Sequence, residues 1–425
     1  MGLKANKCAT KMEVYVQNRN GEPLMPCKSA KARHLLRDNK AEIINICPFT
    51  IRLNWDCESN TQEVIVGLDT GAMNVGCSAV SGSKVLYASE TKLRTDISKK
   101  MQRRATYRRS RRTRKTRYRQ PRFDNRKSKR QLPPSLQSKM DSTIKIVNQL
   151  SKILPITKII VEIAKFDAQK LQNPNIEGIG YQKGVTRGYD NVRAYVFERD
   201  KYTCQICKKR EGILQTHHIG QKKDGGSDRP DNMITLHKDC HKKFHLGEIK
   251  HKFTKPKEYK METQVTILKD FIVKELKKKF DVEVTFGHIT KRNRMRLNLP
   301  KSHCFDAIAI CNPHKIERTE TIFKRVCIPR GRYQLTKGIR SEQKLPKGKL
   351  FGFKQWDKVK INNQIGFIKG KRSSGYFDVC DIDGNNISHS VKYTQLQRLC
   401  SNNVMEVIAS PPTDKSVGIR SETTL

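Results

Sequence analysis

The chain has 425 residues, enough for about two to four domains, and its 86 Lys and Arg against 41 Asp and Glu give a formal net charge of +45 at pH 7. Such a surplus is typical of proteins that bind a polyanion, with nucleic acid favoured over an anionic membrane. Because no apolar run approaches the roughly 20 residues that span a bilayer, and residues 1–20 lack the apolar region of a secretory signal, we expect a cytoplasmic protein without a membrane partner.

The first 95 residues predict a small module followed by an antiparallel meander. Residues 12–57 hold a strand-like run at 14–16 and the tetrapeptide Pro-Leu-Met-Pro at 23–26, whose prolines favour an extended segment. Three strands are predicted at 64–69, 74–80 and 84–87, and the last two are joined by a hairpin signal. Asp69 ends the first of these strands.

Residues 96–130 are dominated by arginine. Between Lys99 and Arg130 there are 17 basic residues, one acid and almost no apolar side chain. Arginine favours helix, so we predict a long helix that, without an apolar stripe, is stable only when it lies on phosphates. The candidate nucleic-acid-binding residues of this helix are Arg103, Arg104, Arg108, Arg109, Arg111, Arg112, Arg114 and Lys115.

Helices and strands alternate further along the chain. Apolar residues recur at helical spacing over 140–154 and 265–276, and buried strands are predicted at 158–162 and 282–287. The polar, Gly-rich residues 168–200 are expected to be a linker. The alternation indicates an α/β core.

The first candidate site consists of Asp69, Glu162, His303 and Asp306. Both Asp69 and Glu162 end core strands, and a spacing of three places His303 and Asp306 on one face of a helix. If the two strands are neighbours, the four side chains converge at one edge of the sheet, where clustered carboxylates need a cation between them. Hard oxygen ligands suit Mg²⁺ or Mn²⁺, so we expect metal-dependent phosphodiester hydrolysis there.

Residues 201–250 form a compact module rich in His and Cys. Cys204 and Cys207 have the spacing of a metal knuckle, and His237 with Cys240 can complete a tetrahedral Zn²⁺ site. A site with four protein ligands has no open position, so we expect this one to be structural.

The residues between and after the two knuckles are suited to catalysis. They are His217, His218, Asn232, His241 and His245. A neutral histidine can take a proton from an attacking water, a second can hold a metal ion on the scissile phosphate, and an asparagine can orient the base. A plain zinc ribbon with surface histidines would not account for adjacent histidines and an asparagine between two knuckles.

From about residue 319 onward, turn signals separate short alternating runs, and Asp383-Gly384 is typical of a hairpin turn. We predict a small β-barrel followed by a disordered tail after about residue 410. A basic loop bounded by glycines contains Lys369, Lys371 and Arg372. This loop either reads the bases of a short DNA motif or binds phosphate only, and both alternatives stay open.

Together these motifs resemble two kinds of nuclease. The His/Cys module resembles an HNH (ββα-metal) endonuclease, although His237 stands where a cysteine is common, and the order of Asp69, Glu162, His303 and Asp306 resembles a RuvC-type nuclease of the RNase H fold split into three pieces. The arginine-rich segment resembles a bridge helix. The Pro-Leu-Met-Pro at 23–26 resembles the PLMP module of the IscB family, transposon-encoded compact relatives of the CRISPR type II effector nucleases.

The resemblance divides the chain into segments. They are a PLMP module (12–57), RuvC-I (58–95), an Arg-rich bridge helix (96–130), RuvC-II (131–170), an HNH domain with linkers (171–255), RuvC-III (256–318) and a C-terminal β-rich domain (319–425).

The resemblance also implies an RNA-guided DNA endonuclease. In the HNH module, His218 would be the general base, His217 and His241 metal ligands, Asn232 the orienting amide and His245 a candidate further ligand. One structured guide RNA per protein would pair with one strand of double-stranded DNA. The HNH centre would cut the paired strand and the RuvC centre the displaced strand, with Mg²⁺ or Mn²⁺ at both and structural Zn²⁺ in the HNH domain. The C-terminal domain would contact the guide RNA and read the flanking motif.

Two other functions fit part of the sequence. A guide-free RuvC/HNH nuclease would recognise branched or transposon-end DNA by shape and would cut without RNA. A basic RNA-binding protein or RNA-directed repressor would bind without turnover, but Asp69, Glu162, Asp306 and His218 are all chemically competent, which argues against it.

Overall fold

The structure is a computed structural model that describes residues 13–112, 131–164, 168–181, 184–221, 226–254, 259–316, 321–328, 348–401 and 404–409. The chain forms two compact units, one made of residues 1–165 and 264–425 and the other of residues 166–263. Arg114, Lys115 and the predicted tail after residue 410 lie outside the described residues.

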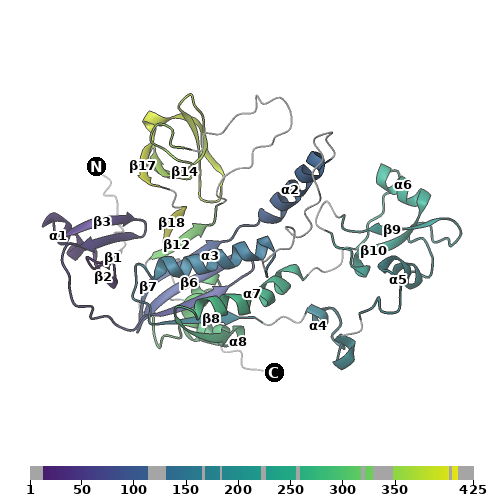
Figure 1. Ribbon diagram of the computed structural model, residues 1–425, viewed down its shortest axis with the longest axis horizontal. Coiled ribbons are helices and arrows are strands. Elements are labelled where there is room, and N and C mark those ends of the chain that lie inside the picture. Colours follow the sequence, from purple (N-terminus) through teal and green to yellow (C-terminus); the bar gives the residue numbers. More distant parts are fainter. Residues whose placement is uncertain are drawn as a thin grey trace, which may run out of the picture. The chain divides into compact units, whose positions relative to one another are not determined.

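The larger unit is built on a seven-stranded sheet with the order β11-β8-β5-β6-β7-β12-β18 (Figure 1). Strands β5 (Ile65–Thr70), β6 (Asn74–Ser81) and β7 (Lys84–Lys92) form the predicted antiparallel meander. Strand β8 (Lys158–Ile163) joins β5 in parallel, and β11 (Asp281–Phe286) joins β8 in parallel. This mixed α/β arrangement confirms the predicted RNase H-like core.

Helices cover both faces of this sheet, because alternate strand residues point to opposite faces. Helices α3 (Pro134–Leu150) and α7 (Lys260–Leu276) pack on the face that carries Val66 and Leu68 (Figure 1). Helix α9 (His303–Ile310) packs on the other face, against Ile65 and its neighbours. Helix α8 (Gly287–Arg296) follows β11 and contacts α9.

The C-terminal region differs from the prediction in its connection to the core. Strand β12 (Thr321–Val326) pairs in parallel with β7, and β18 (Met405–Ala409) pairs with β12, so both extend the central sheet. A separate antiparallel five-stranded sheet lies between them in the chain. Its strands are β13 (Lys358–Ile361), β14 (Gln364–Lys371), β15 (Tyr376–Cys380), β16 (Asn386–Lys392) and β17 (Gln397–Cys400).

The opening module is a four-stranded sheet with one helix. The sheet contains β1 (Glu13–Gln17), β2 (Pro23–Lys28), β3 (Ala41–Ile46) and β4 (Phe49–Leu53). The predicted extended segment at 23–26 lies in β2, which pairs with β1. Helix α1 (Ser29–Arg37), which we did not predict, buries only Ala32.

The arginine-rich helix α2 spans Ile97–Arg112, within the predicted segment. None of its described side chains is buried, and Arg103, Arg104, Arg108 and Arg109 are exposed. The absence of an apolar stripe along this part of the helix agrees with the sequence.

The smaller unit holds the His/Cys module. Its elements are α4 (Ala168–Gln172), a 3₁₀ turn at Gly178–Tyr181, α5 (Val192–Arg199), β9 (Leu214–His218), a second 3₁₀ turn at Pro230–Asn232, β10 (Met233–His237) and α6 (Lys238–Leu246). The expectation of a linker throughout 168–200 is wrong for α5. Asn191 caps this helix by accepting from the Ala194 N–H, and Val196 alone is buried, too few apolar residues to show helical periodicity.

Candidate active sites

The first candidate site lies where β5 and β8 end. Asp69 and Glu162 are direct neighbours across this parallel pair. The Thr70 hydroxyl donates to the Glu162 carbonyl over 3.1 Å, which ties the two strand ends together. The strand pairing that the sequence could only assume is therefore present.

Helix α9 brings His303 and Asp306 to the same edge. The His303 Nδ1 atom lies 2.6 Å from Asp69 Oδ2, and the Ser302 hydroxyl caps the helix by accepting from the Phe305 N–H. Gly76, the partner of Asp69 on β6, makes this approach feasible, because a Cβ there would lie 1.8 Å from the His303 carbonyl oxygen.

The electrostatics of this centre fit a bound cation. Burial raises the pKa of the Glu162 carboxyl, and the Asp69 and Asp306 carboxylates raise it further. Burial also raises the pKa of Asp306. The hydrogen bond to Asp69 raises the pKa of His303. Two carboxyl groups whose ionisation is opposed, beside the oxygen donors of Asp69, suit a divalent metal ion.

Arg294 is a member of this site that the sequence did not reveal. Its guanidinium Nη1 donates to Asp306 Oδ1 over 2.7 Å, and both side chains are largely buried. Helix α8 is held in place by the Asn293 side chain, which donates to the Ala309 carbonyl of α9. Arg294 thus supplies a positive charge at the carboxylate that a metal ion would bind. Because the chain is strongly basic throughout, the sequence alone does not distinguish Arg294 from its other arginines.

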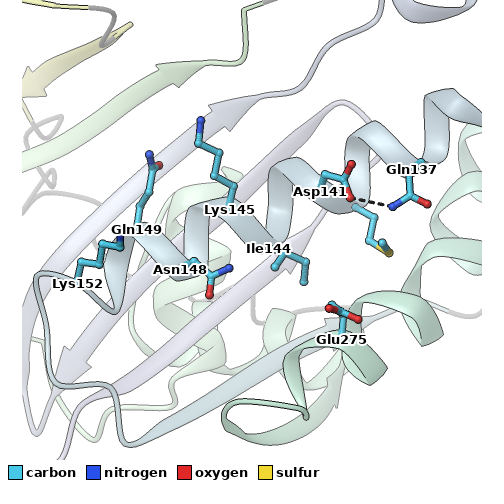
Figure 2. A pocket seen from close by; sticks show the side chains of 9 residues that line it. Gln137, Asp141, Ile144, Lys145, Asn148, Gln149, Lys152 and Glu275 are labelled. Atoms are coloured by element: carbon cyan, nitrogen blue, oxygen red, sulfur yellow. Dashed lines mark hydrogen bonds between the residues drawn. The ribbon is translucent and has the colours of Figure 1, made fainter. Parts of the chain in front are cut away.

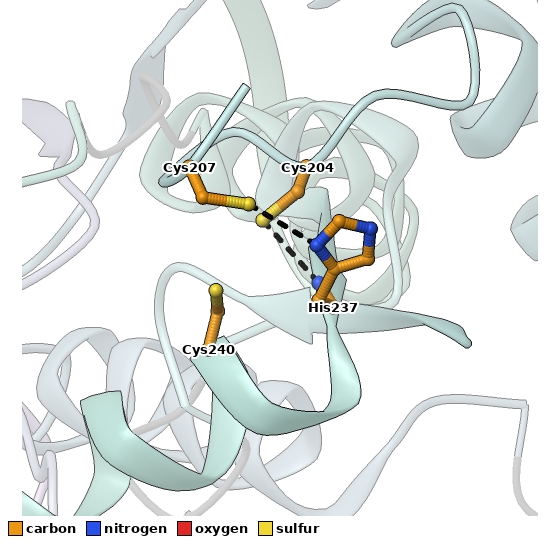
Figure 3. Close-up of side chains that lie close together, drawn as sticks. All are labelled: Cys204, Cys207, His237 and Cys240. Atoms are coloured by element: carbon orange, nitrogen blue, oxygen red, sulfur yellow. Dashed lines mark hydrogen bonds between the residues drawn. The ribbon is translucent and has the colours of Figure 1, made fainter. Parts of the chain in front are cut away.

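In the smaller unit, the four predicted zinc ligands converge (Figure 3). Their ligand atoms, from Cys204, Cys207, His237 and Cys240, all lie within 4.8 Å of one another. Cys207 Sγ is 3.1 Å from His237 Nδ1, and the His237 N–H donates to Cys204 Sγ over 3.3 Å.

The protonation of these thiols also fits a metal. Burial works against ionisation of Cys204, but backbone N–H groups of the knuckle outweigh it and hold its pKa below the usual value. Burial and the neighbouring Cys207 and Cys204 sulfurs raise the pKa of Cys240 to about 12. The cluster therefore favours a first thiolate and resists further ones unless a cation is present, as in a Cys₃His zinc site.

A second cluster joins His217 of β9 with His241 and His245 of α6. Their ring nitrogens lie within 4.8 Å of one another, and His241 Nε2 is 3.0 Å from His245 Nε2. The Gln215 side-chain oxygen lies 2.9 Å from His241 Nδ1, which leaves Nε2 to face the cluster. The structure thus brings His245 together with the two predicted ligands.

The surroundings of His217 and His241 favour the neutral imidazole by lowering the pKa of each ring. Burial lowers the pKa of His217 to about 4, and the nearby imidazoles of His241 and His245 lower it further. Burial and His245 lower the pKa of His241. Neutral imidazoles offer lone pairs to a metal ion, and three nitrogen donors suit a transition metal better than Mg²⁺.

His218 and Asn232 lie beside this cluster but do not bond each other. The Asn232 amide donates to the carbonyls of Gly220 and Ser227, and its oxygen accepts from the Gly220 N–H. His218 Nε2 is instead 2.8 Å from Asp228 Oδ1. Among the described residues, Asn232 therefore orders the loop after β9 and contacts no His218 atom by hydrogen bond.

Comparison with known families decides the assignment. A family model described as "RRXRR protein" matches residues 14–184, and the "HNH endonuclease" model matches residues 204–246. The first spans the opening module, the meander and α2, where 108–112 has the sequence Arg-Arg-Ser-Arg-Arg.

The chain thus combines an RRXRR domain with an HNH domain, which makes it IscB-like.

Residues 204–246 therefore form an HNH endonuclease domain. A curated relative, Anaredoxin of Nostoc sp. (strain PCC 7120 / SAG 25.82 / UTEX 2576), is 35% identical over 66 residues, which are 87% of its length and 15% of this chain. Among solved structures, three of Streptococcus thermophilus Cas9, in complex with the AGAA, GGAA and AGGA PAM, align at TM-scores of 0.29, 0.31 and 0.29, with identities of 14%, 14% and 13%. The alignments cover 42% of this chain, which spans 26% of the Cas9 length.

The predicted basic residues of the C-terminal sheet are engaged within the protein. The Lys371 ammonium is buried and donates to the Gly348 carbonyl, and burial lowers its pKa. Lys369 donates to the Gly384 carbonyl, and Arg372 lies beside Asp378. The three side chains therefore bind other parts of the C-terminal sheet and its connections.

A groove runs along α3 towards α7 (Figure 2). Its volume is about 610 Å³, and Ile144, Lys145, Asn148 and Glu275 are among the residues that line it. None of the predicted site residues lies in this groove.

No helix in the described parts of the chain is long and apolar enough to cross a membrane.

Proposed function

We propose that this IscB-like chain is an RNA-guided DNA endonuclease with two nuclease centres, one for each strand. The observation that carries the proposal is the convergence of Asp69, Glu162, His303 and Asp306 at one edge of the central sheet, in a chain that also has an HNH domain. Two hydrolytic centres on one chain suit a double-stranded substrate.

At the carboxylate centre, Asp69, Glu162 and Asp306 would hold the metal ions. When bound, divalent ions at either centre supply positive charge for the scissile phosphate and an activated water. His303 has its Nδ1 atom on Asp69, so its Nε2 atom is the one available for proton transfer at the reacting water or leaving oxygen. Arg294 bonds only Oδ1 of Asp306, so Oδ2 would be the oxygen offered to a metal ion, with the guanidinium charge close by.

At the HNH centre, His217, His241 and His245 would hold the metal ion, and His218 would take the proton from the attacking water. The Zn²⁺ ligands lie at the ends of the same elements: Cys204 and Cys207 in the preceding knuckle, His237 at the end of β10, and Cys240 at the start of α6. A structural Zn²⁺ would therefore fix α6, and with it His241 and His245, against the β9–β10 hairpin.

Guide RNA is the proposed means of target selection. The net charge of +45 and the exposed arginines of α2 provide sequence-independent contacts to phosphate, whereas base pairing supplies sequence. We assign the guide-paired strand to the HNH centre and the displaced strand to the carboxylate centre. The C-terminal five-stranded sheet would contact the RNA and the motif beside the target.

The first test is to express the chain with its native flanking DNA, purify it and sequence the RNA that stays bound. One discrete structured RNA with a variable end supports guidance, and DNA matching that end should be cleaved in a metal-dependent manner. A random cellular mixture, with cleavage of branched DNA in the absence of RNA, would establish the guide-free nuclease instead.

A further inference from the structure

The loop between β9 and β10 is closed by a small set of contacts. Asn232 is buried and holds both ends of the loop through the carbonyls of Gly220 and Ser227. Gly226 packs so closely on Gly220 that a Cβ at Gly226 would lie 1.8 Å from the Gly220 carbonyl oxygen. These contacts fix the backbone immediately before Asp228.

Asp228 emerges from this closed loop beside His218. Its Oδ1 atom is 2.8 Å from His218 Nε2, while 60% of the Asp228 side chain remains exposed. A contact this exposed adds little to stability. The closed loop therefore places a carboxylate oxygen within hydrogen-bonding distance of the His218 ring.

We propose that Asp228 is the positioning residue of the HNH centre, which orients the His218 imidazole and selects the tautomer with its proton on Nε2. A carboxylate oxygen can only accept, so the His218 Nε2–H donates to Asp228 and Nδ1 keeps its lone pair. No described residue is a hydrogen-bond partner of that Nδ1 atom. Nδ1 is thus the nitrogen that can take a proton from an attacking water.

The same arrangement explains Asn232. Asn232 acts on His218 indirectly, because it closes the loop that carries Asp228. Asp228 does not touch the reacting atoms in this scheme, and it acts through His218. This inference rests on the proposed role of the HNH centre.

The test compares four variants in the guide-loaded full chain: Asp228→Ala, Asp228→Asn, Asp231→Ala and His218→Ala. Asn keeps a neutral acceptor of the same shape, so it separates the hydrogen bond from the charge. Asp231 is a matched control, because it lies in the same loop and pairs with Arg229 over 3.1 Å, away from His218. Single-turnover rates are measured on each DNA strand at saturating protein, with Zn content by mass spectrometry.

We expect Asp228→Ala to slow cleavage of the guide-paired strand at least about tenfold, with Asp228→Asn in between and Asp231→Ala unchanged. Affinity for the DNA, Zn content and cleavage of the displaced strand should stay the same. In the His218→Ala background, Asp228→Ala should have no further effect, because its only route of action has been removed. An unchanged rate in Asp228→Ala, or an equal additional loss in the His218→Ala background, would overturn the inference.

A spectroscopic measurement keeps this result separate from failure of the proposed function. With ¹⁵N-labelled histidine, the His218 resonances are assigned by their loss in His218→Ala. The wild type should show His218 with its proton on Nε2, and Asp228→Ala should show a mixture of tautomers. This outcome holds whether or not the chain cleaves the guide-paired strand, and identical spectra in the two proteins would refute the positioning role.

Discussion

The two candidate nuclease centres are built in opposite ways. The carboxylate centre joins β5, β8 and α9, and its residues are separated by up to 237 positions between Asp69 and Asp306. The HNH centre takes its histidines from one hairpin and the helix after it, within residues 217–245. A site assembled from distant strands depends on the register of the whole sheet, whereas a local site depends on one small hairpin and the Cys₃His cluster beside it.

The donor chemistry also differs. Oxygen atoms of carboxylates line the first centre, where burial and like charge raise the pKa of Glu162. Histidine nitrogen atoms line the second, where burial lowers the pKa of His217. The two centres should therefore respond separately to substitution, to the metal supplied and to pH, and each response can test the comparison.

The largest expected effect is the separation of strand cleavage. Asp69→Ala removes an oxygen ligand and the partner of His303, so cleavage of the displaced strand should fall at least about 10³-fold, leaving a nick in the guide-paired strand. His218→Ala should have the opposite result. Strand-resolved cleavage of end-labelled DNA measures both, and a single variant that still cut both strands at wild-type rates would contradict the division of labour.

A substitution that adds only a methyl group should also affect the two centres differently. In Gly76→Ala the new methyl group meets the His303 carbonyl oxygen, so α9 must shift and carry His303 and Asp306 with it. Displaced-strand cleavage should fall at least about 10²-fold, because small misplacements of reacting groups have large effects on rate. Gly348→Ala is the control, since nothing lies within 4 Å of its added Cβ. Equal loss at both centres would show that Gly76 acts on the whole fold.

The choice of metal should produce a smaller difference. Carboxylate oxygens accept Mg²⁺ readily, whereas three imidazoles favour a transition metal. Replacing Mg²⁺ by Mn²⁺ should therefore speed cleavage of the guide-paired strand about tenfold more than cleavage of the displaced strand. Strand-resolved rates across a titration of each metal test this, and identical metal preferences for both strands would count against the nitrogen-ligand centre.

The smallest effect concerns stability and pH in metal-free protein. The pKa of His217 falls from its usual 6.5 to about 4 in the fold, so protonation favours the unfolded chain and the smaller unit should lose stability as pH falls from about 6.5 towards 4. The pKa of Glu162 is raised, so its protonation favours the folded chain and acid should stabilise the carboxylate centre.

Thermal unfolding from pH 7 to pH 5 can separate these two responses. Glu162→Gln should reduce the acid stabilisation of the larger unit, to which Asp306 and His303 also contribute, and leave the acid loss of the smaller unit unchanged. Parallel pH dependence of the two units in the wild type would be inconsistent with these opposite shifts.

Much of the HNH centre could be predicted because its residues are near one another in the chain. The spacing of Cys204 and Cys207 and the adjacent His217 and His218 indicate a metal hairpin without knowledge of the rest of the fold. Asp228 could not be singled out, because an aspartate in a polar loop is ordinarily a turn residue. Its contact with His218 depends on how Asn232 closes that loop.

The carboxylate centre was predictable only in part. Apolar runs ending at Asp69 and Glu162 indicated two strand ends, but their pairing had to be assumed. Arg294 and Gly76 could not be singled out from the sequence, since their roles depend on contacts made in the fold. Arg294 of α8 contacts Asp306 of α9, and Gly76 lies against the backbone of α9. The extension of the central sheet by β12 and β18 was also missed, because strand partners far apart in sequence leave no periodic pattern.

For this protein, local sequence alone determines the elements and the residue types at their ends: an apolar strand that stops at an acid, a helix without an apolar stripe, and two metal knuckles. These follow from hydrophobic periodicity, charge and ligand spacing, which act over a few residues. Only the tertiary structure decides which ends meet, that α9 lies close enough to the sheet for His303 to reach Asp69, and that Asp228 reaches His218. Those contacts depend on sheet register and loop closure, which arise when distant segments pack together.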